Sequence, residues 1–159
     1  MNNSALRLNT GYFIVPSGVY INGDFSVSLY VKFYKFYFGE RIFEFGTTAD
    51  QHIVIFLVDG SNKLRFDIYH NYVNEYFSSN TIMQLNKWYY VVLTLSNKLY
   101  RIYIDGKLDI SYTLSYAPAD VMRTKNYFGK SRANEAPADI DLSDIKLYNR
   151  ALDISEIKN

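Results

Sequence analysis

The chain has 159 residues, of which 48% are hydrophobic and 18% aromatic, so it is long enough for one domain with a sizeable core. Its formal net charge is +1 and it has no run of Lys or Arg, which argues against a nucleic-acid partner. Cysteine is absent and no apolar run is long enough to span a membrane, which excludes disulfides, thiol catalysis, cysteine-bound metals and membrane insertion.

Alternation of apolar and polar residues with a period of two dominates the first half of the chain and predicts strands. Residues 25–33 place their apolar side chains on one face, so they predict a half-buried strand. Residues 52–58 are almost continuously apolar, which predicts a strand covered on both faces. The polar residues 59–62 predict a turn, after which residues 64–69 alternate again.

The second half of the chain continues the same pattern. Residues 88–95 form another apolar run, and residues 100–104 alternate after a short polar turn. Asp105-Gly106 is typical of a two-residue hairpin turn, because both central residues of a type I′ turn need positive φ. Residues 107–114 are then expected to form the partner strand of this hairpin.

The last residues carry the helical signal. Asp153 can cap a short helix, and Glu156 follows three residues later, as in a capping box. We therefore predict an all-β fold, an antiparallel two-sheet β-sandwich or jelly roll with a short C-terminal helical turn. We expect residues 1–159 to form a single domain. Because the first residues lack the pattern of a signal peptide, we expect the domain to be a module of a larger protein if it is secreted.

Several segments carry patterns that belong together in one known family. They are residues 23–32, 86–92, 103–106, 126–131, 144–152 and 156–157. In this order and spacing they resemble the laminin-G-like, concanavalin A-like lectin-glucanase superfamily of jelly-roll domains. The resemblance implies two antiparallel sheets stacked face to face, an extracellular or cell-surface location, and a non-catalytic binding or adhesion role. It also implies a glycan as a frequent ligand and calcium as a frequent bound ion.

Acidic residues cluster near one end of the chain, at Asp139, Asp141 and Asp144. Calcium binds six to eight oxygen ligands, mostly carboxylates and carbonyls, so these residues are the candidate metal ligands. Ser143 stands where the family usually has an Asp, which is a departure from the family's calcium site. The alternative is a solvated acidic loop that is paired with nearby cations such as Arg132 or Lys130.

The direction of these carboxylates depends on the regularity of the strand. If Ile145 and Leu147 point into the core, then Asp139 and Asp141 share their face and point inward. A buried carboxylate needs a partner, so a metal ion would serve. A β-bulge that turns the carboxylates back to solvent is the other solution.

Aromatic and polar residues cluster over residues 69–76. Sugar rings stack their C–H faces on aromatic side chains, while polar neighbours bind the hydroxyl groups. The predicted ligand-binding residues for a glycan or glycoprotein are Tyr69, His70, Asn71, Tyr72, Asn74 and Tyr76. The same aromatics could instead cover the edge of the sandwich or contact neighbouring protein subunits. We expect Trp88, which stands at the family's core tryptophan position, to lie in the core.

No residue pattern predicts catalysis. Glucanases with this fold carry a Glu-x-Asp-x-x-Glu strand that supplies the nucleophile and the acid/base, and that spacing does not occur here. The two histidines, His52 and His70, have no neighbouring pattern of a catalytic triad. We therefore predict a non-catalytic recognition module for glycans or glycoproteins, with calcium as the candidate structural or ligand-bridging ion. The alternative is a structural or adhesive module of a surface filament or multi-domain adhesin without a small ligand.

Overall fold

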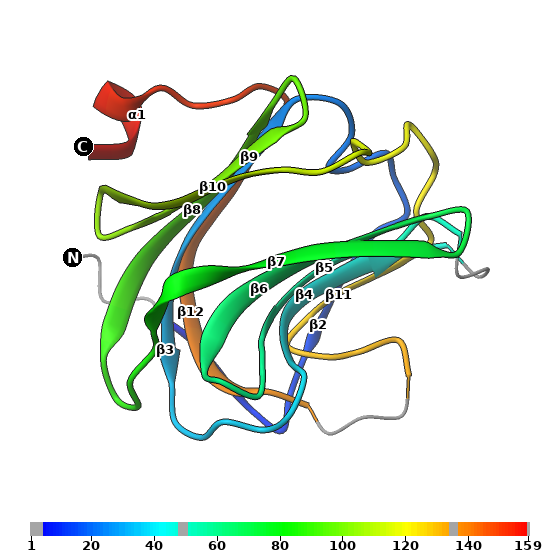
Figure 1. The fold of residues 1–159 in the computed structure, drawn as a ribbon. Coiled ribbons are helices and arrows are strands. Elements are labelled where there is room, and N and C mark those ends of the chain that lie inside the picture. Colours follow the sequence, from blue (N-terminus) through cyan, green and yellow to red (C-terminus); the bar gives the residue numbers. More distant parts are fainter. Residues whose placement is uncertain (1–4, 48–50, 134–136, 159) are drawn as a thin grey trace.

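The computed structural model describes residues 5–47, 51–133 and 137–158. Two antiparallel six-stranded sheets stack face to face, which confirms the predicted two-sheet sandwich (Figure 1). The first sheet has the order β1-β12-β3-β8-β9-β10 and the second has the order β2-β11-β4-β5-β6-β7. The strands are β1 (Leu6–Asn9), β2 (Phe13–Val15), β3 (Phe25–Phe33), β4 (Glu40–Gly46), β5 (Val54–Val58), β6 (Lys63–His70), β7 (Val73–Ile82), β8 (Trp88–Ser96), β9 (Leu99–Ile104), β10 (Lys107–Thr113), β11 (Lys125–Phe128) and β12 (Asp139–Tyr148).

The strands form where the sequence alternates. In β3 the odd-numbered residues Phe25 to Phe33 are fully buried and point between the sheets, as predicted. All five residues of β5 are buried, which confirms that this strand is covered on both faces. Asp105 and Gly106 have φ values of 50° and 75°, so the tight turn between β9 and β10 is also confirmed.

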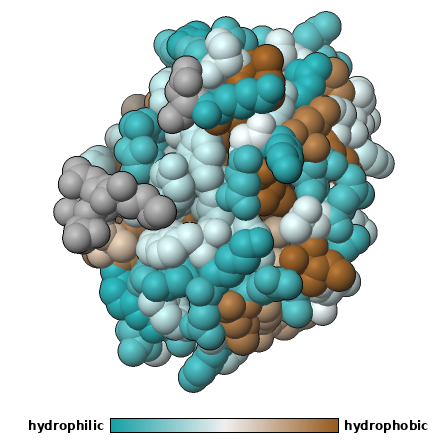
Figure 2. Space-filling model, turned by 90° about the vertical axis from the view of Figure 1, so that its left-hand side faces the viewer, coloured by the Kyte–Doolittle hydropathy of each residue, from teal (hydrophilic) through white to brown (hydrophobic). Residues whose placement is uncertain are grey.

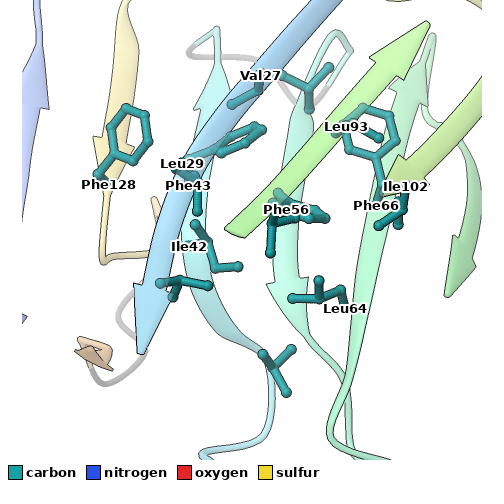
Figure 3. Packing of buried hydrophobic residues seen from close by; sticks show 14 of the residues in the cluster. Val27, Leu29, Ile42, Phe43, Phe56, Leu64, Phe66, Leu93, Ile102 and Phe128 are labelled. Atoms are coloured by element: carbon teal, nitrogen blue, oxygen red, sulfur yellow. The ribbon is translucent and has the colours of Figure 1, made fainter. Parts of the chain in front are cut away.

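The core fills the space between the two sheets. Figure 3 shows side chains from β3, β8 and β9 of the first sheet meeting side chains from β4, β5, β6 and β11 of the second. Phe43 lies at the centre of the aromatic part, with ring centroids 5.7 Å from both Phe56 and Phe128. Burying one such side chain contributes roughly 1.5–3 kcal/mol. This rigid core holds the outward-facing side chains of both sheets in fixed rows.

The short helix α1 (Ile154–Lys158) follows β12 and packs on the outer face of the first sheet, where Ile157 contacts Val92 and Tyr103. Its capping box is confirmed, because the Asp153 carboxylate accepts a hydrogen bond from the backbone N–H of Glu156 at 3.0 Å. The Glu156 carboxylate accepts one from the backbone N–H of Asp153 at the same distance. Within the described residues, no helix has the length and apolar character needed to cross a membrane.

Trp88 is not in the core, so that expectation was wrong. The side chain is half-buried on the outer face of the first sheet, with the Lys32 ammonium 5.0 Å from its ring. The reason is the alternation along β8, in which Tyr89 and Val91 point into the core and Trp88 therefore points away from it.

Candidate functional site

The predicted calcium ligands lie on or beside β12, at the outer face of the first sheet. A β-bulge between Ser143 and Lys146 shifts the register against β3 and leaves Asp144 with a φ of 49°. Before the bulge, Ile140 and Leu142 point into the core, so the alternate residues point out. The interpretation that places the carboxylates on the core face was therefore wrong, and the alternative of an intervening bulge is confirmed.

Each of the three aspartates has a cationic partner. Asp139 pairs with Arg7 (2.5 Å), and Asp144 pairs with Lys146 (2.8 Å). Asp141 pairs with Lys32 at 2.9 Å and accepts a hydrogen bond from the Tyr34 hydroxyl at 2.8 Å. Among the described residues, no group of three or more His, Asp or Glu side chains is arranged to hold a metal ion. Calcium at this position stays a prediction, and bound calcium would have to compete with these cations.

The predicted glycan-binding residues all belong to the hairpin of β6 and β7. Asn71 and Tyr72 form its tight turn, with φ values of 47° and 68°. Tyr69 pairs with Asn74 across the two strands, and Asp67 pairs with Tyr76. Because cross-strand partners share one face, Tyr69, Asn74 and Tyr76 lie together on the outer face of the second sheet.

His70 lies on the other side of the same hairpin. Its ring stacks on Tyr116 with a centroid distance of 4.5 Å and an interplanar angle of 7°. It therefore packs at the edge of the sandwich and does not share a face with Tyr69, which precedes it in the strand. The structure thus separates the six predicted residues into an outer-face group, a turn and an inward-facing histidine.

The outer face of the second sheet contains a hollow of about 350 Å³, which we call the central hollow. Strands β4, β5, β6 and β11 supply part of its lining, and the residue before β5 and the segment after β11 supply the rest. The residues that line it are Arg41, Glu44, Ile53, Ile55, Tyr69, Lys125, Ser131, Arg132 and Ala133. It combines one aromatic ring with apolar and charged groups, which is the composition of a site for a small polar ligand.

Glu44 organises the polar side of the central hollow. Its side chain is buried, with the residue only 3% exposed, and its two carboxylate oxygens accept hydrogen bonds from two arginines. Arg41 Nε donates to Oε2 at 2.9 Å, and Arg132 Nε donates to Oε1 at 2.8 Å. Arg132 Nη1 also donates to the carbonyl of Thr47 at 2.7 Å. These contacts hold both guanidinium groups in place.

A second polar group flanks the hollow on β6 and β7. Arg65 donates two hydrogen bonds to the Asp67 carboxylate, at 2.9 and 2.7 Å. The same guanidinium lies over the ring of Tyr76, with its carbon 3.7 Å from the ring centroid. Burial raises the pKa of Asp67, and the hydrogen bonds from Arg65 oppose that rise. The Tyr76 ring and its cation therefore form a fixed platform beside the hollow.

Sequence reasoning named Tyr69 and Tyr76 as candidates, did not name Arg41 or Glu44, and named Arg132 only as a possible partner of the acidic cluster, whereas the structure pairs Arg132 with Glu44. One signal for Glu44 was present, since it stands between Phe43 and Phe45 in an alternating strand and must point away from the core. Its contact with Arg132 joins residues 88 positions apart. A pattern of local spacing does not contain a contact over that distance.

The outer face of the first sheet lies on the left-hand side of Figure 1 and is turned toward the viewer in Figure 2. It holds a smaller hollow of about 160 Å³ whose lining includes Asp144, Lys146, Tyr30 and Tyr90. The two tyrosine rings lie 4.9 Å apart. In Figure 2 the hydrophobic residues that the structure describes form separate patches on this face. The described residues of this face therefore present no single broad apolar surface of the kind that marks a large protein interface.

A family model described as the concanavalin A-like lectin/glucanases superfamily matches residues 8–158, nearly the whole chain. A comparison with curated proteins found no significant match. The family match agrees with the two stacked sheets of the structure.

Solved structures with a similar fold include domain 4 of AbnA, a GH43 extracellular arabinanase from Geobacillus stearothermophilus, in complex with arabinotriose. It shares 18% identity with a TM-score of 0.81, and the match covers 97% of this chain and 74% of that one. The CBM40 of the Ruminococcus gnavus IT-sialidase, bound to α2,3-sialyllactose, shares 10% identity with a TM-score of 0.74, and 92% and 94% are covered. The Trypanosoma rangeli sialidase in complex with the inhibitor DANA shares 19% identity with a TM-score of 0.70; the match covers 97% of this chain but 26% of the sialidase. At these identities the similarity shows the fold alone.

Proposed function

The chain belongs to the concanavalin A-like lectin/glucanases superfamily, and from this premise we propose that it is a non-catalytic recognition module that binds a glycan. The binding site is the central hollow on the outer face of the second sheet. The observation that carries this proposal is the combination of the Tyr69 ring with the network of Arg41, Glu44 and Arg132 in one hollow. The partner is a free glycan or the glycan of a glycoprotein, and the site of action is extracellular or at the cell surface.

The chemistry of the central hollow matches the needs of a sugar. A sugar ring has apolar C–H faces, which fit the Tyr69 ring; the buried Ile53 and Ile55 lie against this tyrosine and help to hold it in place. Its hydroxyl groups need fixed donors and acceptors, which Glu44 and Arg132 supply. Burial raises the pKa of Tyr69, so its hydroxyl stays neutral and can both donate and accept at physiological pH.

The comparisons support this class of function at a coarse level. The titles of two solved structures name a bound sugar, arabinotriose in the AbnA domain and sialyllactose in the CBM40. The alternative, a structural or adhesive module without a small ligand, would need a surface for self-association. On the face in Figure 2 the described apolar residues lie in separate patches, so this face offers no broad apolar surface for self-association among the described residues.

A glycan array followed by titration calorimetry tests the proposal. We expect wild-type protein to bind a defined set of glycans, and Tyr69→Ala to weaken that binding by about tenfold or more, because a contacting aromatic contributes more than about 1.4 kcal/mol. Tyr112→Ala is the matched control, since it removes an exposed tyrosine from β10 of the first sheet. Tyr72→Ala tests the turn of the predicted hairpin in the same assay.

The results separate the candidate functions. Absence of glycan binding together with self-association in analytical ultracentrifugation would support the adhesive module. Equal weakening by Tyr69→Ala and Tyr112→Ala would place the glycan somewhere other than the central hollow. Melting curves of each variant show whether a loss of binding comes from a loss of folding.

A further inference from the structure

The smaller hollow on the outer face of the first sheet, which we call the bulge hollow, has its own set of aromatic and polar side chains. Its volume is about 160 Å³, less than half of the 350 Å³ of the central hollow. The residues that line it are Tyr30, Tyr90, Asp144, Lys146, Tyr148, Leu152 and Glu156. No described residue belongs to both linings, so the two hollows are separate.

A short side chain on β3 explains why a hollow forms at this place. On its outer face β3 presents Ser28 and, two residues later, Tyr30. Ser28 pairs across the sheet with Lys146 of β12 and with Val92 of β8. Tyr30 pairs with Tyr90 of β8. Ser28 is only 2% exposed although it faces outward, because the larger side chains around it stand above it.

Three tyrosines form the aromatic part of the bulge hollow. The rings of Tyr30 and Tyr90 lie 4.9 Å apart at an interplanar angle of 31°. Tyr148 of β12 adds a third ring from the other side of β3. The Tyr90 hydroxyl shares a hydrogen bond with Ser28, and burial raises the pKa of Tyr90. This hydroxyl therefore stays neutral at physiological pH, and its ring is held in place.

The charged groups of the bulge hollow are paired but still within reach of a ligand. After the bulge in β12, the Asp144 carboxylate lies 2.8 Å from the Lys146 ammonium, and both side chains are 51% exposed. The Glu156 carboxylate accepts hydrogen bonds from Arg150 at 2.8 and 2.6 Å. Each carboxylate of the lining thus has its own cation. This balance suits the hydroxyl groups of a neutral ligand better than a charged group.

The segment that leads into α1 forms one wall of the bulge hollow and is fixed by the fold itself. Ser26 Oγ donates a hydrogen bond to the carbonyl of Arg150 and accepts one from the backbone N–H of Leu152, both at 2.9 Å. Ile157 of α1 is 1% exposed and packs on the sheet. Leu152 and Glu156 are therefore held in position, and a preformed wall lowers the entropic cost of binding.

We propose that the bulge hollow is a second glycan-binding site, which takes one neutral terminal sugar. The sugar packs a C–H face on the rings of Tyr30 and Tyr90, and its hydroxyl groups bind Lys146 and Asp144. The hollow suits a single sugar because it is smaller than the roughly 300–1,000 Å³ of sites for larger ligands. This inference goes beyond the proposed function, since it concerns the other sheet of the sandwich.

Titration of ¹⁵N-labelled protein with the methyl glycosides of galactose, glucose, arabinose and N-acetylglucosamine tests this inference by NMR. At least one glycoside should shift the amide signals of β3, β8 and β12 around Tyr30. Tyr30→Ala should weaken this binding by about tenfold or more, whereas Tyr30→Phe keeps the ring and should retain it. Tyr112→Ala is the control, because it removes an exposed tyrosine of the same sheet from outside the hollow.

A second variant guards against loss of folding in Tyr30→Ala. Lys146→Met removes a donor from a half-exposed side chain whose surface ion pair contributes little to stability. It should weaken binding of the glycoside and leave the melting temperature unchanged. Unchanged affinity in both Tyr30→Ala and Lys146→Met would overturn the bulge hollow as a sugar site.

Tyr69→Ala separates this inference from the proposed function. We expect this variant to bind the glycoside at the bulge hollow as tightly as wild type does. Amide shifts confined to the region around Tyr69, or no shift with any of the four glycosides, would overturn the second site and leave the proposed function standing. Shifts around Tyr30 in a protein whose central hollow binds no glycan would support the second site and overturn the proposed function alone.

Discussion

Glu40, the first residue of β4, is a buried carboxylic acid whose ionisation should set the pH dependence of stability. The residue is 2% exposed, and its Oε1 accepts a hydrogen bond from the backbone N–H of Asp139 at 2.7 Å. Its Oε2 is buried without a hydrogen-bond partner among the described residues. Burial, with a smaller effect of the Asp139 charge, raises the pKa of Glu40 from its usual 4.5 to about 7.

The sign of the effect follows from the protons bound in each state. Between pH 4.5 and about 7 the folded protein holds the Glu40 proton and the unfolded chain releases it. The free energy of unfolding therefore falls as the pH rises through this window. One pKa unit corresponds to about 1.36 kcal/mol, so the pKa difference amounts to about 3 kcal/mol of stability lost above pH 7. Below pH 4.5 both the folded and the unfolded state hold the Glu40 proton, so Glu40 no longer makes the stability depend on pH.

Glu40→Gln is the matched variant, because glutamine keeps the acceptor for the Asp139 N–H and cannot ionise. Urea unfolding at about pH 5 and about pH 8 should show the variant more stable than wild type at the higher pH, by up to about 3 kcal/mol, with a much smaller difference at the lower pH. A stability difference that is the same at both pH values would refute the reasoning, because it would reflect packing and not ionisation.

Two further substitutions test other parts of the fold. Asp141→Asn removes the charged partner of Lys32, so the free energy of unfolding should fall by about 1–2 kcal/mol. The decrease should be the same in calcium and in chelator. A decrease in stability that is seen only with calcium would instead establish a calcium site at Asp141. Gly129→Ala should lower the free energy of unfolding more than Gly106→Ala. Both glycines have φ near 75°, so an alanine costs roughly 1–2 kcal/mol of backbone strain at either position. At Gly129 the new Cβ would also lie 2.7 Å from Leu8 Cδ1, whereas at Gly106 its nearest neighbour would be 3.8 Å away. Equal melting temperatures for the two alanine variants would contradict this.

Local sequence patterns determined most of the fold because each strand is specified by its own neighbours. The alternation in β3, the Asp105-Gly106 turn and the Asp153 capping box each depend on residues a few positions apart. Trp88 shows the limit of the family pattern. Its position at the start of β8 suggested the core, but the alternation along that strand places Tyr89 in the core instead.

The candidate site was predicted less completely, for two physical reasons. Sequence proximity grouped Tyr69 with His70, although consecutive residues of a strand point to opposite faces. The polar network of the hollow depends on Glu44 and Arg132, which the fold brings together from β4 and from the segment after β11. A one-residue bulge at Asp144 likewise reversed the direction expected for the residues before it.

The two outer faces of the sandwich are covered differently, and this difference supports placing the proposed binding site on the second sheet. On the first sheet, α1 covers part of the face, and Ile157 buries Val92 and Tyr103 against it. On the second sheet, no helix within the described ranges covers the apolar strip of Ile53, Ile55 and Leu57, which lies under Tyr69 and the charged side chains around it. Ile53, Ile55 and Leu57 are 5% exposed or less, so a ligand in the central hollow would contact mainly the Tyr69 ring and the charged side chains that Glu44 and Asp67 hold in place.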